Sequence, residues 1–285
     1  MHTAYLDYGS SRIRYSRWGT GNKILLCFHG YGESADSFAF LEDVSGNEFT
    51  ILAIDLPFHG KTEWREGPLF QTDDLLAILN GIIGDKTGVG GAATEGAATE
   101  GGGDRKWWLL GYSMGGRVAL GILERVPEKI EKLVLVCPDG LKMNGWYWLA
   151  TQNAPGRGLF RWTMKNPGWF FFFLKAADQF RLVNRSVYKF TVNYIGDPGV
   201  REELYRRWTV LRKFRPDIPA IQALIRRLRI PVRLLYGRYD RIIRWETGAK
   251  FSREAGTDCR LVILETGHSL LREKNGDILL ELIKY

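Results

Sequence analysis

Short, continuous apolar runs alternate along this chain with segments in which apolar residues recur every three or four positions. Runs of the first kind are typical of strands covered on both faces, and the second pattern is typical of a helix with one buried face. The predicted strands span 23–28, 49–54, 107–111, 133–136, 232–236 and 259–264. The predicted helices span 34–44, 72–83, 114–126, 246–254 and 269–283. We therefore expect an α/β fold with a mostly parallel central sheet and helices on both of its faces.

The N-terminus and one internal stretch depart from this alternation. Residues 5–8 and 12–18 alternate between apolar and polar side chains, which predicts a β-hairpin. Residues 85–104 are mostly Gly, Ala, Thr and Glu and contain a tandem repeat of Gly-Ala-Ala-Thr-Glu. Such a composition cannot bury a core, so it predicts a surface loop.

A longer departure covers residues 141–228, which are rich in aromatic side chains at helical spacing and are interrupted by Pro155 and Pro167. We predict that residues 1–140 and 229–285 form a core domain. Residues 141–228 would then form a helical cap, or lid, over the carboxyl edge of the sheet. Most of its aromatic side chains are expected to form the insertion's own core, and some to line the roof of a pocket.

Composition narrows the class of protein. The 285 residues are 45% hydrophobic and 25% charged, which is typical of a soluble globular protein. The chain has no long uncharged apolar run and no signal-peptide pattern at its start, so we expect no stable membrane insertion and a cytoplasmic location. Cys27, Cys137 and Cys259 lie in apolar runs and are expected to be buried thiols in a reducing compartment.

The charge balance is basic, with a formal net charge of +8 and frequent arginines between residues 201 and 244. No helix-turn-helix, zinc or base-stacking pattern accompanies them, so we expect no nucleic-acid partner. The simplest interpretation is a solvated basic surface. The alternative is that one or two of these arginines bind an anionic group of a substrate.

The candidate chemistry centres on Gly111-Tyr112-Ser113-Met114-Gly115. This G-x-S-x-G pattern lies between a predicted strand and a predicted helix, where a sharp turn exposes the serine side chain. The two flanking glycines fit this turn because a Cβ at either position would collide with the neighbouring strand or helix.

Three further stretches accompany this motif in a fixed order. They are His29-Gly30-Tyr31-Gly32, Asp55-Leu56-Pro57-Phe58-His59-Gly60, and Gly267-His268 after the last strand. With the G-x-S-x-G stretch they make four motifs, and Asp240 is the fifth element of the pattern. On these residues the chain resembles the α/β-hydrolase fold superfamily, as a serine hydrolase with a helical cap, over nearly its whole length. The dehalogenase and epoxide-hydrolase branches carry aspartate at the position of Ser113 and are excluded.

The resemblance implies a nucleophile, a base and an acid. Ser113 is the expected nucleophile, and His268 is the expected base that accepts its proton. Asp240, at the end of the strand 232–236, is the expected acid that orients the imidazole. Asp139, one strand earlier, stays open as the alternative acid because some members of the superfamily use that site. Its other interpretation is a turn residue before Gly140.

The resemblance also implies an oxyanion hole formed by the backbone N–H groups of Tyr31 and Met114. Gly30 and Gly32 would let the first loop bend close to the serine, although an ordinary strand-to-helix turn would also use glycines. Phe58 stands where the family often has glycine, which we expect to change loop shape more than chemistry. The chain has no phosphate-binding loop, no H-E-x-x-H and no cysteine cluster, so we predict no cofactor and no metal.

Together these features predict a serine hydrolase that cleaves a small carboxylic ester through an acyl-enzyme. A carbon–carbon bond hydrolase that holds a substrate carboxylate with an arginine such as Arg117, a thioesterase and an acyltransferase use the same three groups and stay open. An alternative of another class is a ligand-binding receptor on a hydrolase scaffold. The expected partner is a small-molecule acyl substrate, and the sequence does not indicate an oligomeric state.

Overall fold

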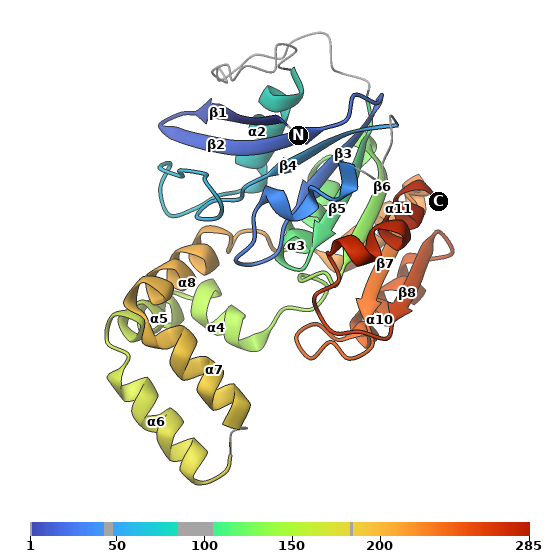
Figure 1. Cartoon of the computed structure of the whole chain (residues 1–285). Coiled ribbons are helices and arrows are strands. Elements are labelled where there is room, and N and C mark those ends of the chain that lie inside the picture. Colours follow the sequence, from blue (N-terminus) through green and yellow to red (C-terminus); the bar gives the residue numbers. More distant parts are fainter. Residues whose placement is uncertain (1, 43–47, 85–104, 183–184) are drawn as a thin grey trace. The chain divides into compact units, whose positions relative to one another are not determined.

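The computed structural model describes residues 2–42, 48–84, 105–182 and 185–285 (Figure 1). Contacts within the chain divide it into two compact units. Residues 1–142 and 213–285 form one, which we call the sheet unit, and residues 143–212 form the other, which we call the helical unit. The predicted loop at 85–104 lies outside the described residues.

An eight-stranded sheet organises the described part of the sheet unit (Figure 1). Its strands are β1 (His2–Tyr8), β2 (Ser11–Trp18), β3 (Lys23–Phe28), β4 (Phe49–Ile54), β5 (Trp107–Tyr112), β6 (Ile130–Val136), β7 (Val232–Gly237) and β8 (Cys259–Leu264). They lie in the order β1-β2-β4-β3-β5-β6-β7-β8. Strand β2 is antiparallel to both of its neighbours, and every neighbouring pair from β4 to β8 is parallel. The prediction of a mostly parallel sheet is confirmed.

The apolar runs form central strands because both of their faces are covered. Every residue of β4 and β5 is buried. Helices α2 (Thr72–Gly84), α3 (Met114–Arg125), α9 (Ile218–Leu228) and α10 (Trp245–Ala255) contact one another in that order and form a layer. Within it, α3 packs on β3, β5 and β6, and α10 packs on β7 and β8. The carboxyl ends of the parallel strands, where ligands bind in open α/β sheets, therefore share one edge.

The closing helix is shorter than the sequence predicts. Instead of a helix over 269–283, the chain forms a 3-10 turn, η3 (Glu273–Asn275), and then α11 (Gly276–Lys284). The apolar residues Leu270 and Leu271 look like part of a helix face but are buried within the loop that follows β8. The amide of Asn275 donates to the carbonyl oxygen of Leu270 at 2.8 Å, which stabilises this loop.

The predicted helix at 34–44 also differs. The chain there forms a 3-10 helix, η1 (Ala35–Phe38), which the Ser34 side chain caps by accepting from the N–H of Asp36. Residues 43–47 lie outside the described residues. The N–H of Ala35, which has no acceptor within η1, donates to the buried carboxylate of Asp55.

The helical unit contains α4 (Gly145–Gln152), α5 (Ala154–Lys165), α6 (Gly168–Gln179), α7 (Arg185–Gly196) and α8 (Pro198–Val210). Asn144, Asn153 and Asp197 cap α4, α5 and α8, because their side chains accept from N–H groups of the first turn. Its buried apolar residues include Tyr147 and Leu204.

The helical unit is shorter than the predicted insertion. Helix α9, within the predicted range 141–228, groups with the sheet unit because it packs on α3 and α10. That the helical unit caps a site stays a prediction. In the part of the chain that the structure describes, no helix combines the length and the apolar content needed to cross a bilayer.

Candidate active site

Ser113 stands at the sharp turn between β5 and α3. Its backbone adopts φ 49° and ψ −116°, a conformation that L residues rarely occupy. Two hydrogen bonds to the end of β6 hold it there. The N–H of Ser113 donates to the carbonyl oxygen of Val136 at 2.9 Å, and the N–H of Asp139 donates to that of Ser113 at 2.8 Å. A strained residue held by its surroundings is a common feature of functional sites.

The glycines beside Ser113 allow this turn to pack against its neighbours. A Cβ on Gly115 would lie 1.9 Å from the carbonyl oxygen of Phe28, at the end of β3. A Cβ on Gly111 would lie 2.6 Å from the carbonyl oxygen of Gly115. Only glycine permits both approaches, so the first turn of α3 can lie directly against the strand end that leads to Tyr31.

His268 brings two distant side chains together. Its Nε2 lies 3.1 Å from the Ser113 hydroxyl, and its Nδ1 lies 2.6 Å from Oδ2 of Asp240. An ionised carboxylate only accepts, so Nδ1 carries the proton and Nε2 is left to accept from the serine. The imidazole is mostly buried, with 19% of its side chain exposed, and Ser113 is half-buried.

Asp240 is fixed by its own loop as well as by His268. Its Oδ1 accepts from the N–H groups of Ile242 at 2.7 Å and Ile243 at 2.9 Å. Burial by itself would raise the pKa of Asp240, but the hydrogen bonds from His268 and from these two N–H groups outweigh it and lower that pKa. The group is therefore a carboxylate at neutral pH.

Asp139, the alternative acid, lies in a different set of contacts. Its carboxylate forms an ion pair with Arg117 at 2.9 Å. Arg117 is buried, so the pair neutralises a charge beneath the turn that carries Ser113. The structure thus brings Asp240, and not Asp139, within hydrogen-bonding distance of His268.

The loop after β3 lies beside the serine. A Cβ on Gly30 would lie 3.4 Å from Cβ of Ser113 and 3.0 Å from the ring of Tyr112. Tyr31 follows in this loop, and Met114 begins α3, where a backbone N–H has no acceptor within the helix. The two segments expected to supply the oxyanion hole are therefore adjacent, and the roles of the two N–H groups stay a prediction.

His29 ties this loop to the loop after β4. The N–H of Leu56 donates to its Nε2 at 3.0 Å, so the proton lies on Nδ1, which is 2.8 Å from the carbonyl oxygen of Gly30. The neutral imidazole thus supports the loop through two backbone hydrogen bonds. His29 thus has a structural role in this loop, distinct from the role of base that the sequence assigns to His268.

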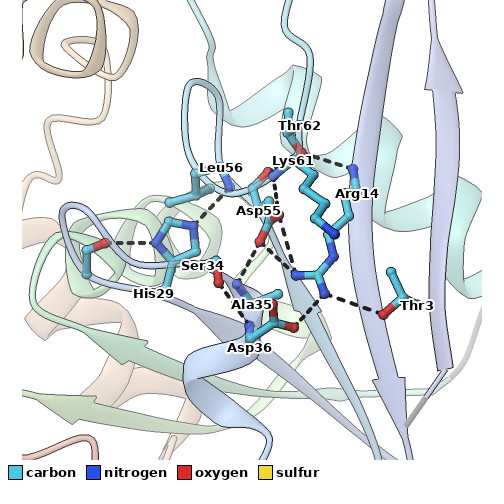
Figure 2. A network of polar contacts seen from close by, with 11 residues as sticks. Thr3, Arg14, His29, Ser34, Ala35, Asp36, Asp55, Leu56, Lys61 and Thr62 are labelled. Atoms are coloured by element: carbon cyan, nitrogen blue, oxygen red, sulfur yellow. Dashed lines mark hydrogen bonds and ion pairs between the residues drawn. The ribbon is translucent and has the colours of Figure 1, made fainter. Parts of the chain in front are cut away.

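A buried ion network supports the same loops from the N-terminal side (Figure 2). Asp55, fully buried, accepts from Arg14 at 3.2 Å and from the backbone N–H groups of Ala35 at 2.6 Å and Lys61 at 2.8 Å. Arg14 also contacts Asp36. Strand β2, the loop after β4 and the start of η1 are therefore joined through one carboxylate.

Phe58 keeps the backbone conformation that glycine would adopt. Its φ is 62°, in the left-handed region. The expectation that a phenylalanine here changes loop shape more than chemistry stays a prediction. The neighbouring hydrogen bonds hold the turn, including that from the N–H of His59 to the carbonyl oxygen of Leu56 at 3.0 Å.

Three residues near His268 were not identified from the sequence. The hydroxyl of Tyr112 donates to the backbone oxygen of His268 at 3.2 Å. The carboxylate of Glu33 accepts from the N–H of Gly30 at 3.4 Å, and burial raises its pKa against the opposing effects of that N–H, Ser37 and the charges of His268 and Arg272. Glu33 directly follows the His-Gly-Tyr-Gly stretch, and this position in the sequence is the feature from which its place near the site could have been predicted.

Cys137 is the third of these residues. It is buried at the end of β6 with φ 42°, and its thiol interacts with Asp240. Burial, together with the charge of Asp240, raises the pKa of the thiol. Cys137, Asp240 and His268 offer ligand atoms within 4.8 Å of one another, the one such group among the described residues. Because the thiol resists ionisation and the other two groups are hydrogen-bonded to each other, this donor set is poorly suited to bind a metal ion.

Two of the arginines that could bind a substrate have internal partners. Arg117 pairs with Asp139. Arg201, in α8, donates at 2.8 Å to the carbonyl oxygens of Met164, Ile195 and Gly196. Both residues therefore stabilise their own units.

Comparison with known proteins identifies the family. The model of the alpha/beta hydrolase family matches residues 24–281. The uncharacterized hydrolase YugF of Bacillus subtilis is 25% identical over 258 residues, which are 89% of this chain and 86% of that protein. A 2-hydroxy-6-oxononadienedioate/2-hydroxy-6-oxononatrienedioate hydrolase of Burkholderia vietnamiensis is 30% identical over 129 residues, 44% of this chain and 39% of that protein.

Solved structures share the fold at lower identity. A thermophilic esterase from Thermogutta terrifontis superposes with a TM-score of 0.63 at 17% identity, covering 100% of this chain and 97% of that chain. The thioesterase domain from the curacin biosynthetic pathway superposes with a TM-score of 0.61 at 17% identity, covering 100% and 99%. Because the family model spans nearly the whole chain, this protein belongs to the alpha/beta hydrolase family.

Proposed function

We propose that this protein is a serine hydrolase that cleaves a small carboxylic ester. The observation that carries the proposal is the position of the His268 imidazole, 3.1 Å from the Ser113 hydroxyl and 2.6 Å from Asp240. A serine hydroxyl becomes a nucleophile when an adjacent base takes its proton. An imidazole held by a carboxylate in the correct tautomer can do so.

In the first half-reaction the Ser113 oxygen attacks the ester carbonyl carbon while its proton passes to Nε2 of His268. The N–H groups of Tyr31 and Met114 stabilise the negative oxygen that develops. Asp240 stabilises the imidazolium, which then protonates the departing alcohol. Water attacks the acyl-enzyme, with His268 as base, and the carboxylic acid leaves with Ser113 restored.

A fluorophosphonate probe tests the nucleophile. It should label the wild-type protein and leave Ser113→Ala unlabelled, with both proteins equally folded by circular dichroism. The matched control is Ser34→Ala, because the Ser34 side chain only caps η1. Equal labelling of the wild type and Ser113→Ala would remove Ser113 as the nucleophile.

Paired substitutions test the acid. Asp240→Asn should lower kcat for a p-nitrophenyl ester by about 10³–10⁴-fold, because the amide favours the wrong imidazole tautomer. Asp139→Asn should leave kcat within about threefold, since it weakens only a structural ion pair. Loss of activity in Asp139→Asn alone would reassign the acid.

A carbon–carbon bond hydrolase is the second candidate. It is favoured by the 30% identity over 129 residues to the hydrolase of Burkholderia vietnamiensis named above. Against it, Arg117 and Arg201 already bind internal partners. A panel of short acyl esters, thioesters and vinylogous β-diketone acids would distinguish these reactions. Turnover of the diketone acids alone would replace the ester proposal.

The same panel tests the receptor alternative. Saturable binding of an ester without product release, in a protein that also fails to react with fluorophosphonate, would support a receptor and would overturn the enzymatic proposal.

A further inference from the structure

The first two turns of helix α6 in the helical unit are apolar on every side, and yet the helix has no buried residue. Its sequence begins Gly168-Trp169-Phe170-Phe171-Phe172-Phe173. Such a helix is ordinarily either buried in a core or in contact with lipid. Its main neighbour within the helical unit is α7 (Figure 1). Within the described residues of the helical unit, therefore, one long side of α6 has no protein partner.

Six exposed apolar side chains lie on α6 or close to it in the sequence. They are Trp162 (51% exposed), Trp169 (36%), Phe172 (70%), Phe173 (62%), Phe180 (74%) and Leu182 (78%). Trp169, Phe173 and Phe180 lie four and seven positions apart, and therefore on one side of the helix. The rings touch, with centroids 6.0 Å apart for Trp162 and Trp169 and 6.1 Å apart for Trp169 and Phe173.

Basic side chains are interleaved with these rings. Arg161, Lys165, Lys175 and Arg181 are all exposed, and none of them forms an ion pair with a described residue. We call the six apolar and four basic side chains together the aromatic–basic surface. By contrast, Arg206 and Arg207 of α8 pair with Glu202 and Glu203. These four cations, which have no ion pair with a described residue, therefore lie close in the sequence to the exposed aromatic residues.

The charge of the whole unit favours an anionic partner. Residues 143–212 contain eleven Lys and Arg against four Asp and Glu, so +7 of the chain's formal net charge of +8 belongs to the helical unit. Two copies meeting through this surface would bring like charges together, which opposes self-association. An anionic lipid bilayer complements this surface, because its headgroups attract the basic side chains and its apolar interior accommodates the aromatic rings.

We propose that the aromatic–basic surface docks the protein reversibly on anionic phospholipid bilayers. Trp and Phe side chains enter the boundary between headgroups and acyl chains, while the lysines and arginines contact lipid phosphates. Helix α6, with 12 residues, is about 18 Å long and cannot span the roughly 30 Å hydrocarbon core, so it lies along the interface. This docking is independent of which acyl compound the enzyme cleaves.

Vesicle flotation of the full chain tests the proposal. The protein should float with vesicles of phosphatidylcholine containing about 30% phosphatidylglycerol, and should float at least about tenfold less with phosphatidylcholine alone or in high salt. The triple variant Trp169→Ser, Phe172→Ser, Phe173→Ser should lose about tenfold or more of the partitioning. The matched control is Trp146→Ser, because Trp146 is 77% exposed in the same unit but lies on α4, outside this surface.

A charge variant guards against misfolding of the triple variant. Lys165→Glu with Lys175→Glu keeps every apolar side chain and should lose about tenfold in partitioning, with an unchanged circular dichroism spectrum and melting temperature. The proposal is overturned if the wild-type protein does not float with the anionic vesicles, or if all variants float as well as the wild type. A wild-type dimer in size-exclusion chromatography that the triple variant abolishes also overturns it, because the surface is then an interface between copies of the chain.

Discussion

At the scale of the residue, the site is built from side chains whose ordinary behaviour is altered by their neighbours. Ser113 is held at φ 49° by hydrogen bonds to the end of β6. Asp240 has a lowered pKa because His268 and two backbone N–H groups outweigh the effect of burial. Each effect comes from a few contacts of one side chain or its backbone, so each can be tested by a single substitution.

The backbone strain at Ser113 should affect the free energy of unfolding of variants at this position. Ser113→Gly and Ser113→Ala both remove the hydroxyl, but only glycine relieves the positive φ. We expect Ser113→Gly to be more stable than Ser113→Ala by about 1 kcal/mol, even after the entropic cost of glycine. Urea unfolding of the two variants measures the difference. Equal stabilities would show that the conformation carries no strain.

Lys132 offers a test of pH dependence. It is buried in β6, and burial, with the charges of Arg233 and Lys23, lowers its pKa to about 8. In the unfolded chain its pKa is about 10.4. Between these two pH values the unfolded chain holds a proton that the folded chain lacks. The contribution of Lys132 to the free energy of unfolding therefore rises from pH 8 to pH 10.4.

Lys132→Met should accordingly stabilise the protein at pH 7, by about 1–3 kcal/mol, and lose this advantage as the pH approaches about 10.4. Lost contact with the Trp108 ring, whose centroid lies 5.1 Å from the ammonium, reduces the gain. Urea unfolding of both proteins at pH 7 and pH 10 gives the comparison. A difference that is independent of pH would contradict the assigned shift.

At the scale of the element, glycines decide how closely α3 approaches the sheet. Gly115→Ala would place a Cβ 1.9 Å from the carbonyl oxygen of Phe28. We expect a loss of about 3 kcal/mol or more in the free energy of unfolding, or failure to fold. Gly158, inside α5, has no atom within 4 Å of an added Cβ. Gly158→Ala should therefore gain about 0.5–1 kcal/mol from helix propensity.

Urea unfolding followed by far-UV circular dichroism checks both variants. A Gly115→Ala protein as stable as the wild type would mean that α3 does not rest on the end of β3. Loss of stability in Gly158→Ala would mean that α5 has a neighbour at this position.

At the scale of the whole molecule, the two units differ in how much apolar surface they bury. Strands β4 and β5 are buried throughout, whereas α6 contains no buried residue. Segments with few buried contacts open at low free energy. Backbone amides of α6 should therefore exchange hydrogen at least about 100-fold faster than those of β5, measured by mass spectrometry on peptides from each element. Equal protection would indicate that α6 has a covering partner in solution.

Much of the fold could be predicted because its signals are local. Strands β3, β4 and β8 have the predicted bounds, since an apolar run between polar turns requires no knowledge of its neighbours. The residues near 270 were misassigned because burial in a loop and burial on a helix face produce the same apolar pattern. The predicted insertion ends at residue 228, whereas the helical unit ends at residue 212. The sequence could not show this difference, because only the packing of α9 on α3 and α10 assigns α9 to the sheet unit.

The sequence by itself determined the family resemblance, the order of the strands along the chain and the candidate roles of Ser113 and His268. Only the tertiary structure decided which carboxylate lies against the imidazole, because that contact joins residues 28 positions apart and depends on β7 lying beside β8. It also decided that Glu33 and Cys137 lie near the site and that the rings of α6 are exposed. Periodicity reports which side of an element is apolar, whereas the partner of that side depends on how the elements pack.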